Sequence, residues 1–208
     1  MKAIFRISTL ALIILSSCSL PCKRESPQSL DYPPELRIVR RAEWGWKPLS
    51  GSVPKQQQIR KITIHHGGTD FFPEDDPVAH IRNLQNWSRD TKHWIDIPYH
   101  YMMDLDGVIY EARPLEYAGD TNTNYDPTGH VLICLMGNYE NIEVAPEQME
   151  ALIDFCSYMV KTYGLSPDDI QGHKDYSDQT VCPGKNLYRY LEDGSIRSKV
   201  AGKLQFKP

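Results

Sequence analysis

The sequence predicts a single α/β domain in which helices flank one central, mainly mixed β-sheet. Segments typical of strands alternate along residues 37–196 with segments of helical periodicity. The chain has 208 residues, of which 40% are apolar and 24% charged, an ordinary globular composition that can form one well-packed core. We found no internal repeat in this region. We therefore expect one domain over residues 37–196 and a C-terminal tail over residues 197–208.

The first predicted strand and the helix after it have clear sequence signals. Residues 59–65 alternate apolar and polar side chains, which is typical of a strand, and this strand ends at the adjacent pair His65 and His66. Asp76 followed by Pro77 predicts a helix start, because a carboxylate caps free backbone N–H groups and proline suits the first helical position. Apolar residues then continue at helical spacing.

The middle of the chain predicts a hairpin and then a buried strand. Residues 97–103 and 108–111 flank the dipeptide Asp106-Gly107, a combination typical of a tight β-turn. Residues 131–136 are a continuous apolar run, which favours a central strand buried on both faces.

The clearest helix is predicted over residues 146–163. Apolar side chains repeat there with the helical period, and Gly164 follows as a residue suited to end a helix. The positions of this repeat are Met149, Leu152, Ile153, Cys156, Met159, Val160 and Tyr163.

The N-terminus predicts export. Residues 1–17 combine the positive charges of Lys2 and Arg6 with an apolar run too short to span a bilayer, as in a signal peptide. Small residues then precede Cys18, which resembles a bacterial lipoprotein signal in which the Cys18 thiol carries diacylglycerol. Ordinary secretion is the alternative. The proline-rich residues 18–36 are expected to be a flexible tether, which would leave a membrane-anchored lipoprotein of the cell envelope that faces the periplasm.

The charge and the cysteines limit the possible function classes. The formal net charge is −4, without a basic stripe, which argues against nucleic acid as a partner. Two cysteines lie in predicted secondary structure, Cys134 and Cys156, and are most simply small buried hydrophobic residues, although a disulfide bond between them stays open. The others are Cys18, Cys22 and Cys182.

Two histidines and one cysteine are candidate metal ligands. Adjacent side chains on a strand point to opposite faces, so if the isoleucines of this strand face the core together with His66, His65 faces a more polar cleft. His173 follows another short apolar segment, and Cys182 comes nine residues later. Two imidazoles and a thiolate can hold Zn²⁺ with a fourth position open to water. By spacing alone, a surface histidine and an unrelated cysteine are the better explanation of the pattern.

Several motifs in a fixed order extend over nearly the whole domain. They are His65-His66 at a strand end, Ile97-Pro98-Tyr99-His100-Tyr101, Asp106-Gly107-Val108-Ile109-Tyr110-Glu111-Ala112-Arg113, Gly137-Asn138-Tyr139, and Gly172-His173 leading to Cys182-Pro183-Gly184. This order resembles the zinc-dependent N-acetylmuramoyl-L-alanine amidases of the type 2 amidase and peptidoglycan recognition protein family, which also contains T7 lysozyme. The segment Arg40 to Trp46 resembles the start of recognition-protein domains.

The resemblance implies a zinc site with His65, His173 and Cys182 as ligands. It also implies that Tyr99 lies near the metal and assists the bound water or the developing oxyanion, with Thr180 as a possible hydrogen-bond donor. The alternatives are a core aromatic for Tyr99 and a turn residue for Thr180. The chain departs from the family where it reads Ala118-Gly119-Asp120-Thr121 in place of a loop histidine.

His130, at the start of the next predicted strand, is a candidate to replace some substrate contacts of that missing loop histidine. The metal site itself does not depend on this departure.

The activity that the resemblance implies is hydrolysis of the amide between the lactyl group of N-acetylmuramic acid and L-alanine of peptidoglycan stem peptides. The expected partners are peptidoglycan or muropeptides, and the chain is expected to act as a monomer. A recognition module that binds without cutting is the main rival, but such modules typically lack the cysteine ligand, so Cys182 favours an enzyme. A cytosolic recycling amidase and a toxin-like amidase are further alternatives; the export signal argues against the former.

Overall fold

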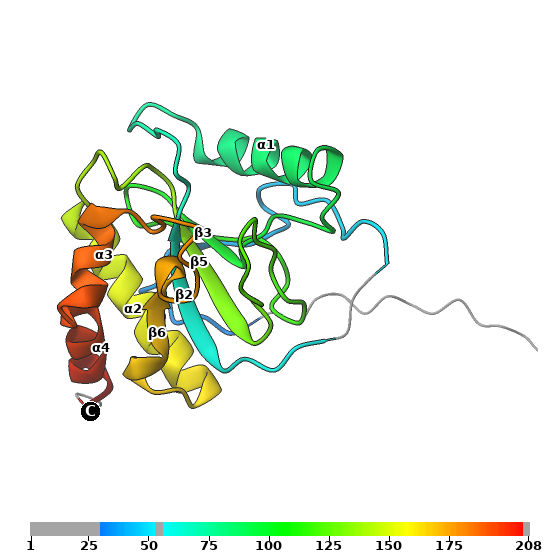
Figure 1. Cartoon of the computed structure of the whole chain (residues 1–208). Helices are drawn as coiled ribbons and strands as arrows, with labels where there is room; N and C mark the ends of the chain where they lie inside the picture. Colours follow the sequence, from blue (N-terminus) through cyan, green and yellow to red (C-terminus); the bar gives the residue numbers. More distant parts are fainter. Residues whose placement is uncertain (1–29, 53–55, 206–208) are drawn as a thin grey trace, which may run out of the picture.

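The computed structural model describes residues 30–52 and 56–205 (Figure 1). The predicted signal peptide over residues 1–17 and the predicted lipidation site Cys18 lie outside the described residues. No helix in the described part of the chain is both long enough and apolar enough to cross a membrane.

A six-stranded mixed sheet forms the centre of the domain. In spatial order, its strands are β1 (Ile38–Val39), β4 (Ile109–Glu111), β3 (Tyr101–Met103), β5 (His130–Leu135), β2 (Lys61–His66) and β6 (Ile170–Gly172). Neighbouring strands are parallel except β3 and β4, which form the predicted antiparallel hairpin. In its turn, Gly107 has a φ of 74°, and a Cβ there would lie 2.7 Å from the Ala151 Cβ, so both conformation and space require glycine.

Helices cover both faces of the sheet (Figure 1). On one face lies α1 (Pro77–Asp90), and on the other lie α2 (Pro146–Tyr163), α3 (Lys185–Glu192) and α4 (Ser195–Gln205). Two 3-10 turns, η1 (Pro167–Asp169) and η2 (His173–Asp175), flank β6. All residues of β5 are buried, with Val131, Ile133 and Leu135 in the cluster on one face and Cys134 in the cluster on the other, which confirms the predicted two-sided burial of this strand.

The helix boundaries follow the predicted signals. Asp76 caps α1, because its Oδ1 accepts a hydrogen bond of 2.9 Å from the backbone N of Val78. Helix α2 has the predicted bounds and ends at Gly164, whose φ of 64° is left-handed. Sequence periodicity missed Gln148 and Phe155, which are also buried on this helix.

The packed part of the chain extends beyond residues 37–196 at both ends. Residues 30–36, expected to belong to the tether, pack against the domain: the Tyr32 hydroxyl donates to Glu111 Oε1 over 2.9 Å, and Leu36 is buried. Residues 197–205, expected to be a tail, continue α4, where Ile196 and Val200 are buried against the other helices. The apolar spacing within this last segment explains why it is helical and packed.

The cysteines within the described residues are not bonded to one another. Cys134 and Cys156 are free and buried, and they belong to the two clusters on opposite faces of the sheet. Both therefore act as small core residues, which is the simpler of the two interpretations of their sequence pattern.

Candidate metal centre

The three predicted ligands meet at one edge of the sheet. His65 lies near the end of β2, His173 directly follows β6, and Cys182 lies in the loop before α3. Because β2 and β6 are parallel neighbours, their carboxyl ends lie side by side, which brings the two histidines together. Each residue offers one ligand atom, and these atoms lie within 4.8 Å of one another. The Cys182 Sγ is 3.6 Å from His65 Nδ1, and all three residues are buried.

His66 has a different environment from His65, as the alternation along the strand predicts. Its Nδ1 accepts a hydrogen bond of 3.2 Å from the backbone N of Tyr139, and although His66 borders the same cleft, it is not one of the three clustered residues. The backbone N of His66 in turn donates to Cys182 Sγ over 3.4 Å, which helps to fix the sulfur.

The loop that carries Cys182 is held by backbone and side-chain contacts on both sides of the cysteine. Thr180 Oγ1 accepts from the backbone N of Cys182 over 3.0 Å, and the Cys182 carbonyl accepts from the backbone N of Lys174 over 2.8 Å. Gly184 has a φ of 88°, and a Cβ there would lie 2.5 Å from the carbonyl carbon of Tyr139. Thr180 therefore stabilises the turn and also lines the cleft described next.

A cleft of about 640 Å³ opens beside the three residues. His65, His173 and Cys182 all line it, together with Tyr99, whose ring centroid is 5.1 Å from that of His65. Residues of α1 and of the segment after it also line the cleft, including Trp87 and Trp94. The metal ligands are therefore buried in the fold but border a space that a substrate can enter.

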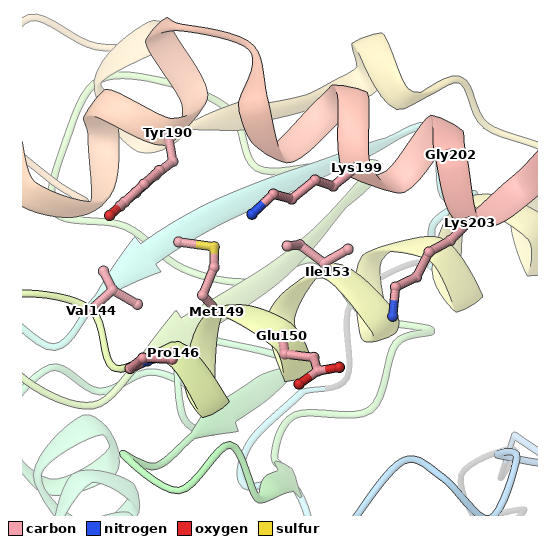
Figure 2. Close-up of a pocket in the computed structure, with 9 residues that line it drawn as sticks. All are labelled: Val144, Pro146, Met149, Glu150, Ile153, Tyr190, Lys199, Gly202 and Lys203. Atoms are coloured by element: carbon pink, nitrogen blue, oxygen red, sulfur yellow. The ribbon is translucent and has the colours of Figure 1, made fainter.

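A second groove, of about 870 Å³, lies between α2 and α4 (Figure 2). Its lining combines apolar side chains such as Met149 and Ile153 with the amines of Lys199 and Lys203, and includes no histidine or cysteine. Lys203 is already paired with Asp154. This groove is larger than the cleft but contains none of the chemistry found there.

Burial determines the protonation of the ligands. It lowers the pKa of His65 well below its usual value, with the nearby His173 as a second cause, and it lowers the pKa of His173 to about 4. Both imidazoles are therefore neutral, which is the form that binds metal. Burial raises the pKa of Cys182 to about 12, so the thiol loses its proton only when a cation compensates the charge. Two neutral imidazoles and one thiol bordering a cleft fit Zn²⁺ with one position left open.

Tyr99 is placed where its hydroxyl remains protonated. Burial raises the pKa of this phenol well above its usual range, with Cys134 as the next cause. A neutral phenol on the cleft wall can donate a hydrogen bond to an oxygen that gains negative charge.

Three residues of the site were not predicted from the sequence, namely Thr121, Thr123 and Tyr125. Their hydroxyl groups contact the two histidines: Thr123 Oγ1 is 2.8 Å from His173 Nε2, and the Tyr125 hydroxyl is 3.5 Å from His65 Nε2. The sequence carries no local signal for these residues, because they lie in a series of bends and their contacts to the histidines join distant parts of the chain.

His130 does not take the place of the missing loop histidine. It is buried, its Nδ1 is 2.8 Å from Thr63 Oγ1, and its ring packs against Tyr125 and Tyr176. It therefore supports the segment behind the metal ligands and does not line the cleft.

Comparisons with known proteins agree with this fold and site. The family described as N-acetylmuramoyl-L-alanine amidase (Amidase_2) matches residues 55–185. Peptidoglycan-recognition protein SD of Drosophila simulans is 30% identical over 162 residues, covering 76% of this chain and 86% of the relative. N-acetylmuramoyl-L-alanine amidase of Sus scrofa is 29% identical over 160 residues, covering 74% of this chain and 26% of that longer protein.

Among solved structures, human PGRP-IBETAC in complex with glycosamyl muramyl pentapeptide has a TM-score of 0.65 and 28% identity, covering 75% of this chain and 94% of that one. The similarity confirms the predicted α/β fold of the recognition-protein and amidase type. The chain belongs to the N-acetylmuramoyl-L-alanine amidase (Amidase_2) family.

Proposed function

We propose that this protein is a zinc-dependent N-acetylmuramoyl-L-alanine amidase, which hydrolyses the amide between the muramic lactyl group and L-alanine of the stem peptide. The observation that carries the proposal is the complete set of His65, His173 and Cys182 beside Tyr99 in one cleft. The name of the Sus scrofa relative supports the reaction, and the ligand of the human structure supports the substrate class.

The residues of the cleft have separate parts in this reaction. The two imidazoles are kept neutral by burial and would hold the cation without giving up a proton, whereas the Cys182 thiol would lose one on binding. Bound zinc supplies a Lewis acid and lowers the pKa of a water molecule. The protonated Tyr99 hydroxyl donates to the carbonyl oxygen as it becomes an oxyanion.

A non-catalytic peptidoglycan-binding module is the rival function, and similarity to recognition proteins gives it some support. The two are separated by incubating the zinc-loaded protein with a muramyl pentapeptide. The amidase proposal expects a free peptide that begins with L-alanine and an intact muramic acid, detected by mass spectrometry. The Cys182→Ala variant is the matched control and yields neither. Binding of the ligand without cleavage by the wild type would support the rival.

The proposed location is the cell envelope, with export by the N-terminal segment and a lipid on Cys18 that anchors the protein to a membrane. Metabolic labelling with a radioactive fatty acid tests it. We expect label on the wild type and none on Cys18→Ala; label that survives the substitution would refute lipidation at this residue. We further propose a monomer, which size-exclusion chromatography with light scattering measures directly.

A further inference from the structure

We propose that the hydroxyl groups of Thr123 and Tyr125 are the outer partners that orient the two histidine ligands, one hydroxyl for each imidazole. This inference rests on the proposed zinc centre and deepens it. A metal-bound histidine binds through one ring nitrogen, and the hydrogen bond of the other nitrogen determines which one that is. Such partners are commonly carboxylates or backbone carbonyls; here the hydrogen bonds run to neutral hydroxyls.

The contact at His173 is the shorter of the two. Its Nε2 is 2.8 Å from Thr123 Oγ1 and 3.4 Å from Thr121 Oγ1. With Nε2 held in this way, Nδ1 is the nitrogen available to the metal. The N–H at Nε2 then donates to Thr123 Oγ1, and the Thr123 hydroxyl can in turn donate a hydrogen bond to Thr121 Oγ1, which is 2.8 Å away.

The contact at His65 follows the same arrangement. Its Nδ1 faces Cys182 Sγ at 3.6 Å, and its Nε2 lies on the other side of the ring, 3.5 Å from the Tyr125 hydroxyl. The Tyr125 ring is stacked on Tyr176 at a centroid distance of 5.6 Å and also packs against His173 at 5.0 Å. One rigid aromatic side chain thus contacts both ligands, and its hydroxyl is fixed by that packing.

The segment that carries these hydroxyls is itself anchored. Arg113, which is buried, donates to the carbonyl of Ala118 over 2.5 Å and pairs with Asp120 just before the segment begins. Asn124 accepts from the Ser177 hydroxyl over 2.6 Å. Thr121, Thr123 and Tyr125 are half-buried while the residues between them are exposed, so all three hydroxyl side chains face the ligands.

The arrangement has an electrostatic consequence. A carboxylate partner would add negative charge next to the cation, whereas a hydroxyl adds none. With one thiolate and two neutral imidazoles, the bound metal keeps a net charge near +1 and therefore more of its acidity toward water. The hydroxyls orient the ligands without weakening the Lewis acid.

The test measures zinc affinity of the full chain by competition with a chromophoric chelator, and does not depend on hydrolysis. We expect Thr123→Val to raise the dissociation constant about 10-fold, the lower end for loss of an outer partner, and Tyr125→Phe to raise it less because its contact is longer. Thr123→Ser keeps a hydroxyl and should bind zinc nearly as the wild type does. Thr162→Val, an exposed substitution on α2, is the matched control.

Thermal unfolding of each metal-free variant shows whether it is folded, and the absorption of the Co²⁺ form reports the geometry of the ligands. Thr123→Val binding zinc as tightly as the wild type would overturn the inference, and so would Thr123→Ser binding as weakly as Thr123→Val, because the threonine would then act by packing. A wild type that binds zinc but releases no peptide refutes only the proposed enzyme; a wild type that binds no zinc refutes both.

Discussion

His100 should make the metal-free protein sensitive to acid. The side chain is fully buried next to β5: its Nδ1 accepts from the backbone N of Leu132 over 2.9 Å, and its Nε2 contacts the Tyr117 carbonyl at 2.9 Å. This pairing requires one N–H and one free lone pair, which is the neutral ring. Protonation would place a second N–H against the Leu132 N–H. Burial accordingly lowers the pKa of His100 from 6.5 to about 3.

The magnitude follows from the difference between the two states. A histidine that is harder to protonate when folded stabilises the fold above pH 6.5, and this contribution falls as the pH drops from 6.5 toward 3. Between pH 6.5 and pH 5, an interval of about 1.5 pH units, His100 is protonated in the unfolded chain but stays neutral in the folded one. At about 1.4 kcal/mol per unit, the His100 contribution to the free energy of unfolding falls by about 2 kcal/mol relative to pH 8.

The contribution of His100 is isolated by urea unfolding of the wild type and of His100→Asn. Both proteins are measured at pH 8 and at pH 5, with a chelator present. Asparagine can keep an acceptor for Leu132 N and does not titrate. We expect the variant to be less stable at pH 8 and the difference to shrink by about 2 kcal/mol at pH 5. Equal differences at both pH values would show that His100 is not a buried neutral group, and the reasoning from its contacts would be wrong.

Three further predictions concern the site. Cys182→Ala should lose bound zinc, measured by elemental analysis, and all hydrolysis while the metal-free protein keeps its unfolding temperature; retained zinc would contradict the ligand assignment. Tyr99→Phe should keep zinc but lower kcat about 100-fold, as expected for one lost oxyanion donor, and an unchanged kcat would exclude that role. Gly184→Ala should lower the free energy of unfolding by about 2 kcal/mol or more, because its Cβ would meet the Tyr139 backbone at 2.5 Å; denaturant unfolding that matches the wild type would contradict this contact.

Much of the fold could be predicted because its signals are local. The Asp76-Pro77 pair, the helical repeat that ends at Gly164 and the apolar run of β5 each determine one element through its own residues. The ends of the domain could not be predicted in this way. Tyr32 lies in a proline-rich segment, and only its distant partner Glu111 shows that the segment is packed.

The candidate site could likewise be predicted only in part. Alternation in β2 separates His65 from His66, and the family resemblance joins His65 to His173 and Cys182, which the structure places together. Neighbouring sequence says nothing about Thr123 or Tyr125, because their partners are more than 40 residues away and depend on how the loop folds back over the ligands. For His130 the sequence suggested a role in the site, whereas in the structure its ring packs behind the metal ligands against Tyr125 and Tyr176.

Hydrolysis of purified peptidoglycan in H₂¹⁸O by the zinc-loaded protein tests the central proposal most directly, with products analysed by mass spectrometry. Attack on the lactyl carbonyl predicts one ¹⁸O atom in the muramic lactyl carboxylate and stem peptides that start with an unlabelled L-alanine. Heavy oxygen at a sugar reducing end, or in a carboxylate within the peptide, would show that a different bond is cut and would contradict the account.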